Sequence, residues 1–278
     1  MRVADEIIRI VSDVHFGDRA SLVDRFEQLG PLFQGASRII FNGDTLDTRE
    51  GPDPEHTARC SHTVRSFVTS TRVPTTFHTG NHDPDFSADH WTSLSDGRVF
   101  VVHGDVLFDD IVPWGQDAPE IRERLRAELA KRALTTGATI PLATRMAIWR
   151  EVARSIPQRH QSERHPLKYA WHFLKDTVWP PTRFAAIFGA WHSEPRRAAE
   201  LVTRERMPAK FVIVGHTHRP ATRKFGSTTV INTGSFTAPF GAAAVDVTPD
   251  HVRVRRVIRR GGEFHLGALI AEFPLAKG

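Results

Sequence analysis

Residues 6–15 read Glu6-Ile7-Ile8-Arg9-Ile10-Val11-Ser12-Asp13-Val14-His15. The first part of this stretch is an apolar run rich in isoleucine and valine, which is typical of a buried strand. The run ends in an aspartate and a histidine, two residue types that bind divalent metals. Because ligands of α/β sheets bind beyond the carboxyl ends of strands, the stretch predicts a strand that delivers Asp13 and His15 to a site.

Four further segments repeat this design, in which an apolar strand runs into Asp, His or Asn beside glycine. They are Phe41-Asn42-Gly43-Asp44, Gly80-Asn81-His82-Asp83, Val102-His103-Gly104-Asp105 and Val214-Gly215-His216-Thr217-His218. Glycine permits tight turns and a close approach of the backbone. One such cluster alone is a weak signal, because a surface turn explains it equally well. All five together predict a single site assembled from strand ends that are far apart in the chain.

The segments between these clusters alternate between strand-like and helix-like patterns. Strands are expected at Glu6–Ser12, Arg38–Asn42, Val73–Thr79, Val99–His103 and Phe211–Gly215, and helical segments at Ser21–Leu29 and Pro54–Thr71. This alternation argues for an α/β domain. After His218 the pattern changes, and successive strands are expected at Thr228–Asn232, Ala242–Val247 and Val252–Ile258. These later strands suggest a second sheet packed on the first.

Residues 114–208 have a different character and are expected to form a helical insertion. Ile121, Leu125 and Leu129 recur every four residues, as on an amphipathic helix. Further helices are expected at Thr144–Ile156 and His165–Val178. Five of the six tryptophans lie in this region or at its edge, namely Trp114, Trp149, Trp171, Trp179 and Trp191. Most of them are expected to bury one helix against another.

The charge of the chain is concentrated in the same region. The net charge is +5, and residues 120–210 carry 18 Lys and Arg against 9 Asp and Glu. A basic block of this kind suggests an anionic partner, such as a phosphorylated metabolite, a nucleic acid or anionic lipid headgroups. A solvated, arginine-rich helix face explains the same charges equally well.

The composition also bears on the cellular compartment. A lone cysteine, Cys60, excludes an internal disulfide and fits a reducing cytoplasm. No stretch approaches the ~20 apolar residues that a membrane-spanning helix needs, and no export signal is expected at the N-terminus. A cytoplasmic location is therefore expected, and peripheral membrane contact through the basic insertion stays open.

The ordered set D-x-H, G-D-x-x-D, G-N-H-D, H-G-D and G-H-T-H resembles the calcineurin-like metallophosphoesterase superfamily. The resemblance implies one domain over residues 1–278, built as an α/β fold: a four-layer α/β/β/α sandwich of two mixed sheets with a helical insertion at 114–208. It also implies two divalent metal ions at the strand ends. Carboxylate, amide and imidazole ligands suit Mn²⁺, the first expectation, and also Fe²⁺ or Zn²⁺.

The resemblance further implies a role for each motif residue. The expected ligands are Asp13, His15 and His218 for the first metal, Asn81, His103 and His216 for the second, and Asp44 as the bridge. His82 matches the superfamily's non-ligand histidine, which contacts the phosphate and protonates the leaving group. Asp47 matches the carboxylate that orients this histidine. The implied chemistry is attack on phosphorus by a hydroxide that bridges the metals.

Two departures separate the chain from the Ser/Thr protein phosphatases of this superfamily. Thr48-Arg49 follows Asp47 where those enzymes carry Arg-Gly, and Asp83 replaces the glutamate of their G-N-H-E motif. The branch that contains UDP-2,3-diacylglucosamine pyrophosphohydrolase is more similar, in length, in the opening S-D-x-H, in Asp109-Asp110 after H-G-D and in the insertion. That enzyme has an arginine where this chain has His82, so the resemblance is to the branch and not to its lipid substrate.

Three functions follow from these features. The favoured one is a phosphomonoesterase or pyrophosphohydrolase that acts on a small anionic, partly apolar substrate. The second is a nuclease or cyclic-nucleotide phosphodiesterase whose basic block follows a phosphate backbone. The third is a metal-binding or scaffold protein without catalysis, which would leave His82 and Asp47 unexplained.

Overall fold

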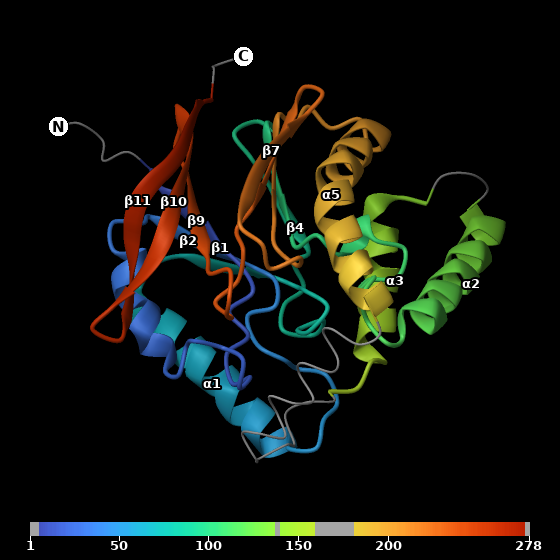
Figure 1. The fold of residues 1–278 in the computed structure, drawn as a ribbon, viewed down its shortest axis with the longest axis horizontal. Coiled ribbons are helices and arrows are strands. Elements are labelled where there is room, and N and C mark those ends of the chain that lie inside the picture. Colours follow the sequence, from blue (N-terminus) through green and yellow to red (C-terminus); the bar gives the residue numbers. More distant parts are fainter. Residues whose placement is uncertain (1–5, 137–139, 159–180, 276–278) are drawn as a thin grey trace.

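The computed structural model describes residues 6–136, 140–158 and 181–275 (Figure 1). Its strands form two mixed sheets. The sheets pack face to face, and helices cover both outer faces (Figure 1). The expected α/β/β/α sandwich is therefore confirmed.

The first sheet has six strands in the order β11-β10-β9-β1-β2-β3. Its parallel half consists of β1 (Ile8–Val11), β2 (Arg38–Asn42) and β3 (Thr75–His78). Its antiparallel half consists of β9 (Ala243–Val247), β10 (His251–Arg260) and β11 (Glu263–Pro274). Three of the motif-bearing strands thus lie side by side, so their carboxyl ends share one edge.

The second sheet has five strands in the order β4-β5-β6-β8-β7. Its centre is parallel and consists of β5 (Val99–Val102), β6 (Phe211–Val214) and β8 (Thr228–Asn232). The antiparallel edges are β4 (Trp91–Leu94) and β7 (Ala221–Phe225). The other two motif-bearing strands, β5 and β6, therefore belong to this sheet.

The strands after His218 do not form a sheet of their own, which corrects the expectation from the sequence. β8 pairs with β6 in the second sheet, where Val230 lies opposite Val212. β9 pairs with β1 in the first sheet, where Val245 lies opposite Ile10. Partners this distant in the chain are chosen by the burial of whole faces, which the local pattern of a strand does not reveal.

The core between the sheets is built by alternate residues of their strands. Ile10 and Ile40 of the first sheet pack with Val101, Ile213 and Ile231 of the second. The intervening residues of β1 and β2, such as Val11 and Phe41, point the other way. There they meet α1 (Pro54–Thr71) and the 3₁₀ helix η1 (Phe26–Phe33). This period of two is the geometry of a strand buried on both faces.

The expected helix at Ser21–Leu29 was wrong, because the ordered element is η1, which begins at Phe26. Pro31 lies inside it and has no N–H to donate, which fits a short 3₁₀ helix better than an α-helix. The expected helix at Pro54–Thr71 is confirmed, and Asp53 caps it by accepting from the backbone N–H of His56 at 2.9 Å.

Three helices lie on the outer side of the second sheet, one against its strands and the others farther out (Figure 1). They are α2 (Ala118–Thr136), α3 (Leu142–Arg154) and α5 (Pro181–Arg204). Helices α2 and α3 match the expected periodic segments, and Trp149 is 1% exposed, as a core residue should be. The expected helix at His165–Val178, with Trp171 and Trp179, lies outside the described residues. In the described part of the chain, no helix is both long and apolar enough to cross a membrane.

Buried Asn42 joins the two sheets at the edge where the motif-bearing strands end. Its Nδ2 donates to the carbonyl of Val102 in β5 at 2.8 Å, and its Oδ1 accepts from Nδ1 of His78 at the end of β3 at 2.8 Å. One amide therefore fixes the ends of β2, β3 and β5 relative to one another. The positions of the residues that follow these strands are fixed by the same contacts.

Candidate metal centre

Six of the seven metal-binding side chains expected from the sequence meet at this edge. Three groups have ligand atoms within 4.8 Å of one another: Asp13, His15 and His218; Asp44, His103 and His216; and His15, Asp44 and His82. The loops after β1, β2, β5 and β6 supply the six expected ligands among them. Asp44 is common to two groups, which is the position expected of a residue shared by two metal ions.

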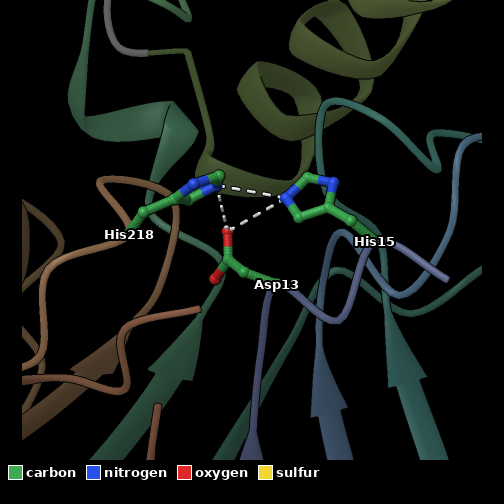
Figure 2. Close-up of side chains that lie close together, drawn as sticks. All are labelled: Asp13, His15 and His218. Carbon is green, nitrogen blue, oxygen red and sulfur yellow. Dashed lines mark hydrogen bonds and ion pairs between the residues drawn. The ribbon is translucent and has the colours of Figure 1, made fainter. Parts of the chain in front are cut away.

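The first group is shown in Figure 2. Oδ1 of Asp13 lies 3.2 Å from Nε2 of His218 and 3.9 Å from Nε2 of His15, and the two Nε2 atoms are 3.1 Å apart. Burial, together with the nearby imidazoles of His82 and His218, lowers the pKa of His15 to about 4. His15 is therefore neutral near pH 7 and can offer a ring nitrogen to a cation.

The second group is held by hydrogen bonds from the far sides of its rings. Nδ1 of His103 lies 2.9 Å from the carbonyl of Asn42, and Nε2 of His216 lies 2.7 Å from that of Ile111. A carbonyl only accepts, so these nitrogens carry the protons, and Nε2 of His103 and Nδ1 of His216 keep their lone pairs. Such outer hydrogen bonds orient histidine ligands in metal sites.

Nε2 of His103 faces Oδ2 of Asp44 at 3.3 Å. Burial lowers the pKa of His103, but the carboxylate of Asp44 opposes this and raises it to about 10. The pair thus favours a positive charge between its two atoms. A divalent cation supplies that charge and uses the histidine lone pair as well.

Two buried polar atoms at the centre support the same conclusion. Oδ1 of Asn81 and Nε2 of His103 are both buried and make no hydrogen bond. Buried polar atoms are almost always satisfied, so unpaired ones need an explanation. Both belong to expected ligands of the second metal, and bound cations would satisfy them. The residues present therefore fit a pair of divalent ions held by oxygen and nitrogen.

The backbone at the centre is in an unusual conformation. Five of the seven expected ligands have a positive φ: Asp13 (53°), His15 (49°), Asp44 (52°), His216 (69°) and His218 (58°). Residues other than glycine rarely adopt this left-handed region. Each such residue costs on the order of 1–3 kcal/mol, and they cluster at functional sites. The ligand loops are therefore shaped for binding at a cost to stability.

Two motif glycines are required by close packing of the loops. A Cβ at Gly80 would overlap Oδ1 of Asp44, and one at Gly215 would overlap the side chains of Asp13 and Ser12. The glycines of G-N-H-D and G-H-T-H thus let a strand end approach the ligand of another loop.

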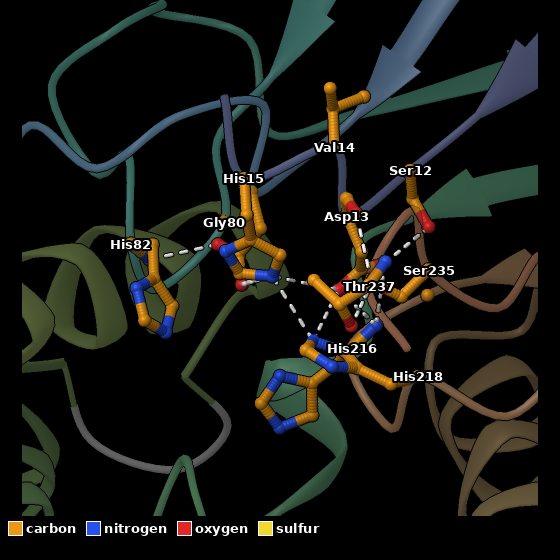
Figure 3. A network of polar contacts seen from close by, with 12 residues as sticks. Ser12, Asp13, Val14, His15, Gly80, His82, His216, His218, Ser235 and Thr237 are labelled. Atoms are coloured by element: carbon orange, nitrogen blue, oxygen red, sulfur yellow. Dashed lines mark hydrogen bonds and ion pairs between the residues drawn. The ribbon is translucent and has the colours of Figure 1, made fainter. Parts of the chain in front are cut away.

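His82 lies beside the ligands, with its ring centroid 4.9 Å from that of His15 (Figure 3). Its Nδ1 is 3.0 Å from Oδ2 of Asp47 and 2.8 Å from Nη2 of Arg49. Arg49 also donates to both oxygens of Asp47, at 3.0 and 2.7 Å. The structure therefore joins the expected pair of His82 and Asp47 and adds Arg49, a residue that the sequence analysis did not assign.

The charges around His82 act in opposite directions on its pKa. Burial and the cation of Arg49 lower it, but Asp44 and the hydrogen-bonded Asp47 outweigh them and raise it above its ordinary value. Burial would raise the pKa of Asp47, yet its hydrogen bonds with His82 and Arg49 hold that pKa well below its usual range. Asp47 is therefore an anion that favours a protonated His82.

The five motifs lie within a segment that matches a known protein family. The calcineurin-like phosphoesterase family matches residues 8–220, which include every residue of the five clusters. The chain belongs to this family. No curated protein sequence matches the chain significantly.

Three solved structures align with most of the chain. Vacuolar protein sorting 29 from Cryptosporidium parvum is 11% identical, with 97% of this chain and 98% of that chain covered and a TM-score of 0.45. A dimetal phosphatase from Danio rerio is 13% identical, with 94% and 98% covered and a TM-score of 0.42. A phosphoesterase from E. coli is 14% identical, with 97% and 100% covered and a TM-score of 0.43. The family assignment rests on the sequence match.

Asp83 positions the central loop of this calcineurin-like phosphoesterase, although the sequence analysis assigned it no role. Its fully buried carboxylate accepts backbone N–H bonds from Asp44 at 3.0 Å, Thr45 at 2.7 Å and Gly80 at 2.6 Å. It thereby ties the loop after β2 to the loop after β3. Its place in the G-N-H-D motif was the available signal.

Helix α5 holds the G-H-T-H loop of the family motif from behind. The buried carboxylate of Glu194 accepts from Oγ1 of Thr217 at 2.9 Å and from Nδ2 of Asn232 at 2.9 Å. Nε1 of Trp191 donates to the carbonyl of the same threonine at 2.9 Å. Thr217 lies between His216 and His218, so this helix fixes two expected ligands through the residue that joins them.

The buried Glu194 predicts a dependence of stability on pH. Burial raises its pKa from 4.5 to about 8. As the pH rises through this range, the unfolded chain loses the proton while the folded chain keeps it, so stability falls. Glu194→Gln has no such proton, and its stability relative to the wild type should rise with pH by at most about 1.4 kcal/mol per unit.

Urea unfolding measures this difference in stability between Glu194→Gln and the wild type. Both proteins are unfolded in the presence of a chelator, at about pH 5 and at about pH 8. Glu200→Gln, which alters an exposed carboxylate of the same helix, is the matched control. A stability difference between Glu194→Gln and the wild type that does not change with pH would contradict the prediction.

Proposed function

We propose that this chain is a dinuclear metal-dependent phosphoesterase that hydrolyses a phosphomonoester or pyrophosphate of a small, partly apolar substrate. The observation that carries the proposal is Asp44, a buried carboxylate shared between ligand groups that include unpaired donor atoms. Asp13, His15 and His218 would hold one ion. Asn81, His103 and His216 would hold the other, and Asp44 would contact both.

Two divalent ions bound there would polarise the phosphoryl oxygens and lower the pKa of a water molecule to the range where it becomes a nucleophile at neutral pH. His82 would carry the other part of the reaction, donation of a proton to the departing oxygen. In the protonated imidazole, Nδ1–H donates to Asp47, so Nε2 is the atom left to give up a proton. General acids of this kind contribute ~10²–10⁴-fold to the rate.

The neighbourhood of His82 supports hydrolysis over passive metal binding. A protein that only stores metal needs neither an acid beside the site nor an anion that favours its protonated form. Here Asp47 is 7% exposed and lies against His82. Three expectations from the sequence stay predictions. They are manganese as the native metal, a cytoplasmic location and the closer resemblance to the UDP-2,3-diacylglucosamine pyrophosphohydrolase branch.

Metal removal and substrate choice test the proposal together. Purified protein treated with EDTA should lose at least ~10²-fold of its activity on p-nitrophenyl phosphate, and Mn²⁺, Fe²⁺ or Zn²⁺ should restore it, because the ions supply the electrophile. Activity on the monoester should exceed that on bis(p-nitrophenyl) phosphate. Preference for the diester, with DNA binding that weakens as salt rises, would favour a nuclease instead. No hydrolysis with any of these metals would leave a metal-binding or scaffold protein.

A further inference from the structure

Four aromatic side chains form a continuous row along α5 and the loop between β8 and β9. Phe184, Phe188 and Trp191 follow one face of the helix, and Phe240 lies across from Trp191. Their ring centroids are 4.8, 5.0 and 5.2 Å apart in that order, with edge-to-face geometry at each step. We call these four residues the aromatic row.

Three of the four side chains of the aromatic row are exposed, and the fourth, Trp191, is half-buried. Phe184 is 51% exposed, and Phe188 and Phe240 are each 49% exposed. None of the four belongs to the three clusters that form the buried core of the described chain. Full burial of one such side chain stabilises a protein by about 1.5–3 kcal/mol, so the row forgoes stabilisation that the fold could have gained. Contiguous apolar surface of this kind commonly marks a binding site.

The inner end of the aromatic row adjoins the metal centre on two sides. Trp191 donates to the carbonyl of Thr217, the residue between two candidate ligands. In the loop that carries Phe240, the hydroxyl of Ser235 donates to the carbonyl of Asp13 at 3.0 Å (Figure 3). The row is therefore continuous with the centre rather than a separate patch elsewhere on the molecule.

A positive charge stands where the aromatic row meets the centre. The guanidinium of Arg219, the residue after His218, lies 5.0 Å from the ring centroid of Trp191. A cation over an aromatic face is attracted by the ring and stays available to an anion. Along the surface, the metal-binding groups are followed by the cation of Arg219 and then by the exposed rings. This order fits a ligand whose phosphate lies at the metal centre and whose apolar group lies on the rings.

We propose that the aromatic row binds the organic part of the substrate and selects esters in which the phosphate is attached to an aromatic ring system. This inference rests on the proposed function, because it places the phosphate at the metal centre. Exposed phenylalanine rings bind flat aromatic groups by offset or edge-to-face contact at centroid distances of 4.5–7 Å. Phe184 and Phe188 are then specificity-determining residues, and neither takes part in the chemical step.

The binding of two non-hydrolysable analogues tests this inference without catalysis. Isothermal titration of the Mn²⁺-loaded protein with naphthyl phosphonate and methyl phosphonate gives both dissociation constants. We expect tighter binding of naphthyl phosphonate, and Phe188→Ala should weaken it about 5- to 10-fold, since aromatic pairs of this kind contribute about 1 kcal/mol. Affinity for methyl phosphonate should stay unchanged.

Phe225→Ala is the matched control, because Phe225 is 44% exposed and lies at the far end of β7, opposite Thr228. Equal losses in Phe188→Ala and Phe225→Ala, or equal affinity of the wild type for both analogues, would overturn the inference. So would a variant that binds naphthyl phosphonate normally but loses binding to anionic vesicles, because the row would then be a membrane surface. If the wild type binds both analogues with the expected preference but hydrolyses no phosphoester with any metal, the proposed function fails and the aromatic row stands.

Discussion

Asp44→Asn is expected to lose both metal ions and with them all measurable hydrolysis. Asp44 is fully buried, and Oδ2 lies 3.3 Å from Nε2 of His103 and 4.0 Å from Nε2 of His15, one histidine from each ligand group. Substitution by asparagine removes the negative charge that both ions would share. Loss of a partner outside the ligand shell already costs ~10–100-fold in metal affinity, so loss of a shared ligand should cost more.

Elemental analysis after dialysis measures this loss directly, alongside activity on p-nitrophenyl phosphate. Asp47→Asn is the matched control, because its carboxylate is also buried in the site but is assigned to His82 and not to a metal. That variant should keep both ions and lose activity. Two ions per chain in Asp44→Asn would show that the two ligand groups do not depend on a common carboxylate.

His82→Ala is expected to keep both metal ions and to lose ~10²–10⁴-fold in kcat. In the proposed assignment His82 is the acid and not a ligand, with Nδ1 held by Asp47 and Nε2 left to donate a proton to the leaving group. The loss should depend on the leaving group. p-Nitrophenolate departs without protonation, so the variant should retain more activity on its ester than on a simple alkyl phosphate.

The ratio of kcat for these two esters, compared between the wild type and His82→Ala, measures the role. His192→Ala, on helix α5, serves as the control for loss of an imidazole. His82 also falls within ligand distance of His15 and Asp44, so the opposite result is well defined. If elemental analysis finds one ion missing from His82→Ala, then His82 is a ligand and the proton comes from elsewhere.

The sequence was sufficient to predict the site residues that directly follow strands. The apolar runs before Asp13, Asp44, His103 and His216 are short and strongly patterned, and strand ends converge whenever parallel strands pair. The six Asp and His residues expected as ligands could therefore be named in advance, and the structure brings their side chains together. The family motifs, and not the spacing alone, separated His82 from them.

Residues that act through the tertiary structure could not be named in the same way. Glu194 reaches Thr217 from a helix whose docking depends on the whole outer layer. Arg49 is two residues from Asp47 in the chain, but its approach to His82 requires the loops after β2 and β3 to meet. The division of the later strands between two sheets also depends on the tertiary structure. β8 and β9 have similar compositions, but β8 pairs with β6 and β9 pairs with β1.

Helix α5 holds the G-H-T-H loop with Trp191 and Glu194, and it exposes Phe184 and Phe188 a turn or two away. For protein engineering, these roles divide the helix into an invariable part and a variable part. Substitutions at 184 and 188 can be sampled freely in a library aimed at new substrates, since neither ring supports the core. Trp191 and Glu194 should be kept in every member, because a helix that loses them would also disturb the loop that carries His216 and His218.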